Sequence, residues 1–409
     1  MISGRAPAAA AALLLLALAA GAARAQAPGD DTTGQQLQAA PGYTFGSNVA
    51  GYLKVSNDVC DFKAALDKSP PDWAAAKALY LDGKNSRRSD GSVRTLRSLA
   101  TGSYVGEPFW DLYTEYFQTP AFADDAIIKA LDGTPPFVTD AQRRETAGKA
   151  VESNLQMAYL MHEMDEAADK IRDNLLSDAT GAPHNVDEVF ALYVGEKPEC
   201  GLWTVSTKRA TDFGTMQTCA QSEVNANMLK AFRDAQAAAR AGDLPAFLRA
   251  RDAVQALFAV TYTQATLKYA YEVERDRVAK KPTDEHQAEG YAFFRTIEPL
   301  VARANKSSAA TVQRIMFPGN AVVPGGDAQV AAAMRAAYPG LQITPAAVGT
   351  FEAKQNLGCV NATSAARAAL NPARPFAGRR LCRPAPLPAG PTFAFASRLL
   401  CWSTLCSAC

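Results

Sequence analysis

Apolar residues recur every three or four positions along most of the chain, which is the spacing that places them on one face of an α-helix. One helix is predicted to start at Ser69–Asp72, run through Tyr80 and stop at Gly83, because a first turn tolerates proline and a helix C-terminus favours glycine. A much longer helix is predicted from Thr139 to Leu176. A shorter one is predicted from Asp327 to Tyr338, where Pro339-Gly340 terminates it. Strand patterns are few and short, such as residues 201–206. The pattern therefore predicts an all-α fold, a bundle of antiparallel helices.

Three eight-residue words resemble one another and lie about one hundred residues apart, each at the end of a helical pattern. They begin at Lys77, Phe190 and Tyr291, and the third is the weakest match. Such a repeat predicts a duplicated helical bundle, with function where the copies meet. We expect one unit over residues 43–180, a second over 181–282 and a partial third over 283–360. Within the copies we expect Tyr80, Tyr193 and Phe294 to pack inside. Chance similarity of short Ala/Leu/Tyr words is the competing explanation.

The two ends of the chain differ in composition from its body. Residues 1–25 carry a basic residue, an apolar run and the small-residue sequence Ala23-Arg24-Ala25, a pattern typical of a secretory signal peptide. Residues 26–42 form a predicted flexible leader, and residues 361–409 a Cys/Pro-rich tail that we expect to be disordered. No later segment is long and apolar enough to span a membrane, so the mature chain is predicted to be exported without a transmembrane segment.

Eight cysteines fit the oxidising conditions outside the cell. Four lie in the body of the chain, and proximity together with the tying of termini suggests Cys200 with Cys219 and Cys60 with Cys359. Eight cysteines allow about 105 pairings, so this is one arrangement among many. The remaining four crowd the tail.

The charge balance limits the range of partners. Forty-two basic and 41 acidic side chains give a formal net charge of +1, so no overall field attracts nucleic acid or an anionic membrane. We therefore expect no nucleic-acid partner.

The most informative chemical pattern lies in the long helix. A stripe containing Val151, Leu155 and Ala158 continues at helical spacing into His162 and Glu166, so that one face changes from apolar groups to groups that can bind a metal ion. The helix predicted from about Leu244 to Lys280 shows the same change where it reaches Tyr269, Glu272 and Asp276. Burial beside carboxylates is easier to explain when a cation or proton is present.

Each of the three histidines has an acidic residue three or four positions away, within reach on the same helix face. Imidazole nitrogen with carboxylate oxygen suits iron, manganese or zinc better than calcium. The predicted ligands are His162, Glu166, His184, Asp187, Glu188, Glu272, His286 and Glu289; further candidates are Glu163, Asp165, Glu274 and Asp276. Surface ion pairs are the alternative for each pair, because acidic residues are common in the chain.

Motifs of hydrolases are missing from the sequence. It contains neither a Gly-x-Ser-x-Gly elbow nor His-Glu-x-x-His, since Glu166 stands where the second histidine belongs. We therefore expect no enzymatic activity.

Three segments carry a resemblance to a known family: Asn57–Leu66, Ala78–Ser86 and Leu357–Cys359. Over about Tyr43–Val360 the chain resembles the low-iron-inducible periplasmic proteins of green algae, also called iron-assimilating or high-CO2-inducible proteins. A looser similarity is to imelysin-like helical proteins, whose His-x-x-Glu spacing recurs at His286 and Glu289.

The resemblance implies a secreted protein of the periplasmic space or cell wall that assists iron acquisition. Iron, ferrous or ferric, would be its ligand, and a plasma-membrane iron transporter or cell-wall components its partners. Two alternatives stay open: a structural or partner-binding extracellular protein without metal, and an imelysin-like metal-dependent peptidase.

Overall fold

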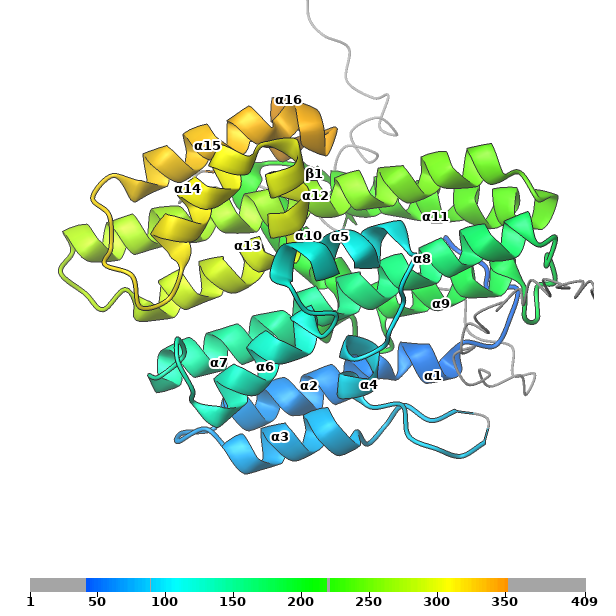
Figure 1. The fold of residues 1–409 in the computed structure, drawn as a ribbon, viewed down its shortest axis with the longest axis horizontal. Helices are drawn as coiled ribbons and strands as arrows, with labels where there is room; N and C mark the ends of the chain where they lie inside the picture. The colour runs from blue at the N-terminus through cyan, green and yellow to red at the C-terminus, as the bar shows by residue number, and fades with distance from the viewer. Residues whose placement is uncertain (1–41, 89, 219–220, 352–409) are drawn as a thin grey trace, which may run out of the picture. The chain divides into compact units, whose positions relative to one another are not determined.

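A computed structural model describes residues 42–88, 90–218 and 221–351, and these residues are almost entirely helical (Figure 1). The chain divides into a unit of residues 1–360 and a unit of residues 361–409, and every described residue belongs to the first. The predicted signal peptide, nearly all of the leader and the Cys/Pro-rich tail lie outside the described residues. The all-α fold class is confirmed.

The helices follow one another with short connections. The helices of at least ten residues are α2 (Val55–Leu66), α3 (Trp73–Asp82), α5 (Pro108–Phe117), α6 (Phe122–Asp132), α7 (Asp140–Lys149), α8 (Gln156–Arg172), α9 (Ala182–Val194), α10 (Leu202–Phe213), α11 (Glu223–Ala241), α12 (Leu244–Val278), α13 (Asp284–Ala304), α14 (Lys306–Met316) and α15 (Gly326–Leu341). The shorter ones are α1 (Ala50–Leu53), α4 (Leu96–Ala100), α16 (Pro345–Val348) and a 3-10 turn at Pro198–Cys200.

The predicted boundaries of α3 are confirmed. The side chain of Asp72 caps the helix by accepting a hydrogen bond from the amide of Ala75. The helix stops at Gly83, which has a φ of 63°, a left-handed conformation that glycine adopts without steric cost. A Cβ at this position would lie only 2.7 Å from the side chain of Val93. The close approach of the segment around Val93 therefore also requires glycine here.

The long helix predicted from Thr139 forms as one continuous rod with a change of winding in its middle. Thr139 and Gln142 cap each other in a capping box. A π-helical segment, Ala150–Leu155, joins α7 to α8, and such segments often lie at functional sites. The rod ends at Arg172, four residues before the predicted Leu176, where Asn174 takes a left-handed φ of 57°.

Two local predictions are wrong. Residues 201–206 are not a strand but the start of α10, whose buried residues Leu202, Val205 and Phe213 lie at helical spacing; a six-residue window was too short to show this period. The described strands are β1 (Met216–Thr218) and β2 (Gln221–Ser222), which pair antiparallel. The sequence Pro339-Gly340 also does not terminate α15, which continues to Leu341.

The core forms where long helices pack in sequential pairs. α8 packs on α9, α11 on α12 and α12 on α13, and α12 also contacts α8, α10 and α15 (Figure 1). The short connections make successive partners antiparallel. Among the described helices none is both long and apolar enough to cross a membrane.

The three repeated words all contribute to this core, as expected. Tyr80, Tyr193 and Phe294 are completely buried. The first two words end their helices, α3 and α9, at a glycine, whereas the third lies inside α13. The shared feature is therefore burial of one aromatic ring, and the duplication itself stays a prediction.

The predicted disulfide pairing is wrong. Cys60 of α2 bonds to Cys200, with their Cα atoms 5.4 Å apart, because α2 packs directly against the turn Pro198–Cys200. The suggested partners, Cys219 and Cys359, lie outside the described residues. The bond links positions 140 residues apart in the sequence, a pairing that proximity along the chain could not reveal.

Candidate metal centre

Helix α8 is unusual because its polar residues are as buried as its apolar ones. Every residue from Gln156 to Asp165 is buried, including His162, Glu163 and Asp165. Buried polar and charged groups are costly unless they find partners. The partners of these three side chains therefore decide what this helix does.

His162 is held firmly through one of its ring nitrogens. Its Nδ1 lies 2.8 Å from Oε2 of the buried Glu107, and its ring stacks on Tyr104 with centroids 3.4 Å apart. A second ring, that of Tyr159, packs at a steep angle against the imidazole. The imidazole is 3% exposed, so its position is fixed by packing on both sides.

The other nitrogen of His162 has no hydrogen-bond partner among the described residues. This Nε2 faces Glu166, whose Oε2 lies 3.7 Å away. An ionised carboxylate only accepts hydrogen bonds, so Glu107 fixes the proton on Nδ1 and leaves the Nε2 lone pair available in the neutral ring. A histidine that donates to a carboxylate through one nitrogen and offers the other is the usual arrangement of a metal ligand.

Two carboxylates complete a cluster that could hold a metal ion. Ligand atoms of His162, Glu163 and Glu166 all lie within 4.8 Å of one another, and among the described residues no other such group of three occurs. Glu163 accepts hydrogen bonds from Tyr52 at 3.1 Å and Asn185 at 2.6 Å. Glu166 is more accessible, with 22% of its side chain exposed, so the cluster reaches solvent on its Glu166 side.

Helix α9 brings two more predicted residues to this cluster. The carboxyl groups of Glu163 and Glu188 are joined by a hydrogen bond, and Nε2 of His184 lies 3.0 Å from Oε1 of Glu188. A hydrogen bond between two carboxyl groups needs a proton on one of them. His184 uses its other nitrogen on Ser47 Oγ, 2.8 Å away, so its two nitrogens are already engaged.

The electrostatics of the cluster favour a bound cation. Burial alone would lower the pKa of His162, but the hydrogen bond to Glu107 and the charges of Glu163 and Glu107 outweigh burial and raise it. Burial alone would raise the pKa of Glu163, yet the charge of His162 and the hydrogen bonds it receives lower it. A proton on Nε2 of His162 would compete with a metal ion for this position.

Asp187 is adjacent in sequence but has a different role. Its carboxylate accepts hydrogen bonds from the hydroxyls of Tyr43 and Ser47, the amides of Gly46 and Ser47, and the side chain of Gln236. These five donors occupy both oxygens. Asp187 thus ties residues 43–47 to α9 and is not part of the cluster.

The remaining predicted ligands lie between α12, α13 and α7. His286 pairs with Asp276 at 2.5 Å, Glu289 pairs with Lys149 at 3.0 Å, and Glu272 pairs with Arg275. Protein groups already balance each of these charges. The structure therefore brings together His162, Glu166, Glu188 and His184, and leaves Asp187, Glu272, His286 and Glu289 elsewhere.

Sequence reasoning ranked one important residue too low and missed others. In the sequence Glu163 is only a further candidate, and it lies next to His162, off the Glu166 stripe. Glu107, Tyr104 and Tyr52 come from segments more than fifty residues away, where no spacing links them to His162. The one signal in the sequence is the position of Glu107, a carboxylate directly before Pro108 at the start of a helix.

The fold and the cluster define an all-α protein with a largely buried histidine–carboxylate cluster that could hold a metal ion. Residues 12–297, most of the chain, match the family of low iron-inducible periplasmic proteins, so the chain belongs to that family. The predicted resemblance is thereby confirmed. No curated protein and no solved structure matches the chain.

Proposed function

We propose that this protein binds iron in the periplasm and concentrates it there for uptake when iron is scarce, without catalysing a reaction. The observation that carries the proposal is the buried Nε2 of His162, which has no hydrogen-bond partner among the described residues and lies beside Glu163 and Glu166. The family description, which joins low iron with the periplasm, supports it.

The donor set suits iron. One imidazole nitrogen and the oxygens of Glu163 and Glu166, with Glu188 next to them, are ligands of the kind that iron, manganese and zinc accept. There is no thiolate in the cluster, which disfavours copper(I). Ferrous iron suits the imidazole and ferric iron suits the carboxylates, so the site accepts either oxidation state.

The accessible side of the cluster offers a route by which a bound ion can be released. Lys170 lies 3.0 Å from Glu166 and 2.8 Å from Asn185, so its ammonium balances Glu166 when no metal is bound. An ion entering along Glu166 displaces this ammonium, and the ammonium returns when the ion leaves. Such exchange fits a protein that passes iron to a membrane transporter or to the cell wall.

Metal analysis of the purified mature protein, followed by iron titration, tests the proposal. The double variant with His162→Ala and Glu166→Ala is expected to lose stoichiometric iron binding, since it removes the free nitrogen and the accessible carboxylate together. The matched control is His286→Ala, which removes a histidine outside the cluster and is expected to keep full binding.

Unchanged iron stoichiometry in the double variant would refute this site. Absence of metal from both the wild-type protein and its titration would instead favour a structural or partner-binding role. Thermal unfolding of each variant, followed by circular dichroism, separates loss of a ligand from loss of the fold.

A further inference from the structure

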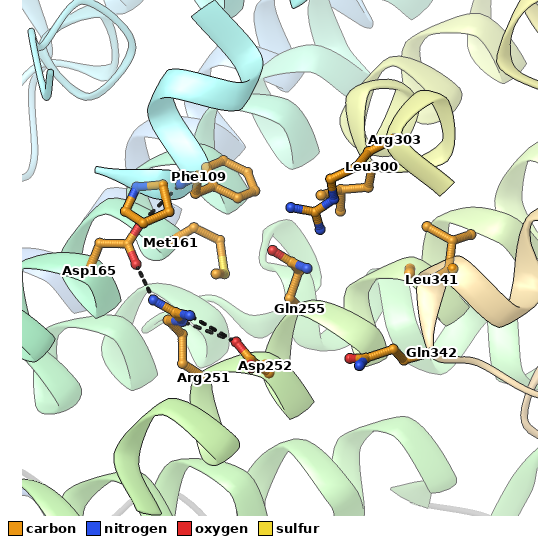
Figure 2. A pocket seen from close by; sticks show the side chains of 13 residues that line it. Phe109, Met161, Asp165, Arg251, Asp252, Gln255, Leu300, Arg303, Leu341 and Gln342 are labelled. Carbon is orange, nitrogen blue, oxygen red and sulfur yellow. Dashed lines mark hydrogen bonds and ion pairs between the residues drawn. The ribbon is translucent and has the colours of Figure 1, made fainter. Parts of the chain in front are cut away.

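A second potential site is a cleft of about 310 Å³ on a neighbouring face of α8 (Figure 2). It is formed by the start of α5, by α8 and α12, and by the ends of α13 and α15. Its volume lies at the lower end of the range of about 300–1,000 Å³ that small-molecule sites occupy. Of the candidate metal ligands, Asp165, one of the further candidates, lines it.

One of its two arginines is neutralised by the protein. Arg251 pairs with Asp165 at 2.8 Å and with Asp252 at 3.0 Å, and Asp165 also accepts a hydrogen bond from the amide of Phe109. Figure 2 shows Arg251 held between the two carboxylates. This side of the cleft is therefore held in place by ion pairs, and its two carboxylates and one guanidinium together leave one negative charge.

The other arginine, Arg303, forms no hydrogen bond or ion pair with any of the described residues. Figure 2 shows its guanidinium and the amide of Gln255 pointing toward one another, with Gln342 on the adjoining wall. Neither amide has a protein partner within the described ranges. Three sets of unused donors thus converge on the same space, and one of them is a cation.

The rest of the lining is apolar. Phe109, Met161, Leu300 and Leu341 face the cleft, and Figure 2 shows Met161 and Leu300 on either side of Gln255. These side chains line one part of a cleft whose surface is otherwise mostly polar. A ligand with a carbon body would contact them as well as the polar groups, whereas an inorganic anion would meet the polar groups alone.

We propose that this cleft binds a small organic carboxylate. The carboxylate accepts two parallel hydrogen bonds from the guanidinium of Arg303, which matches its planar geometry, and a further one from the amide of Gln255. The carbon body lies against Met161 and Leu300. Arg251 holds Asp165 and Asp252 away from Arg303 (Figure 2), and the contacts to Arg303 must outweigh the one negative charge that remains there.

Isothermal titration of the metal-free protein with glutarate, citrate and benzoate tests this site without involving iron. At least one of the three is expected to bind, and glutaramide, the neutral analogue of glutarate, is expected not to. Arg303→Ala is expected to weaken binding about tenfold to a hundredfold, which is the usual effect of losing hydrogen bonds to a charged group. Arg303→Lys is expected to restore part of it.

The matched control is the variant Arg335→Ala, which removes an exposed arginine that lines a different hollow on α15. This variant is expected to bind the carboxylates as tightly as the wild type does. Failure of all three carboxylates to bind, equal binding of glutaramide, or an equal loss in Arg335→Ala would overturn the proposal. Inorganic phosphate binding as tightly as the best carboxylate would also overturn it, since the apolar wall would then contribute nothing.

Discussion

Two regions of the molecule place a histidine among carboxylates, and they balance these charges in different ways. Around His162 on α8, Glu163 and Glu188 face each other and the imidazole, and Lys170 pairs with Glu166 at the edge of the cluster. Around His286 on α13, each carboxylate has its own partner, such as Lys149 for Glu289. The comparison teaches that helical spacing finds both clusters, whereas the helices packed against each one decide which of its charges are paired.

The largest expected effect comes from removing the cation of the second region. Lys149 balances Glu289 at 3.0 Å and Glu145 at 3.6 Å, and 21% of its side chain is exposed. Lys149→Met leaves the nearly buried Glu289 without its cation, and leaves Glu145 with Arg144 alone. The variant is expected to lower the free energy of unfolding by about 3 kcal/mol, the lower end of the range for breaking a buried pair. Urea denaturation measures this change.

The matched variant in the first region is Lys170→Met. It is expected to cost about 1 kcal/mol or less, because Lys170 has one carboxylate partner that is itself open to solvent. Its iron affinity is expected to rise, since a cation beside Glu166 is removed. If Lys170→Met were the more destabilising of the two, the contrast between the regions would be wrong.

An intermediate effect is expected from the carboxylates that orient the two histidines. Glu107→Gln weakens the hydrogen bond that fixes the proton on Nδ1 of His162 and is expected to lower iron affinity about tenfold, as such partners of metal-bound histidines typically do. Asp276→Asn makes the same change at His286 and is expected to leave iron affinity unchanged. Equal losses in both variants, measured by iron titration, would show that the two regions act together.

The smallest expected effect is the change in iron affinity with each unit of pH. His162 has a raised pKa because its interactions with Glu107 and Glu163 outweigh burial, so its imidazolium persists above its ordinary range and competes with the metal. As the pH falls below this raised pKa, iron affinity is expected to fall about tenfold per pH unit for one displaced proton. Titrations from pH 5 to 8 measure this slope, and a flat profile would exclude His162 as a ligand.

Part of the candidate site could be predicted from the sequence. The spacing of His162 and Glu166 at the end of an apolar stripe predicted a buried pair, and the structure places both in the cluster. The same reasoning applied to His286 and Glu289 placed them in a shared site, where the structure shows separate ion pairs. Spacing along a helix defines a face but not what packs against it.

The sequence by itself determined the helical class, the start and end of α3 and the burial of Tyr80, Tyr193 and Phe294, because periodicity and capping act over a few neighbouring residues. Only the tertiary structure decided that Glu107 orients His162, that Glu188 meets Glu163, that Cys60 bonds to Cys200 and that Arg303 faces an open cleft. These contacts join residues far apart in the chain, and their formation depends on how whole helices pack.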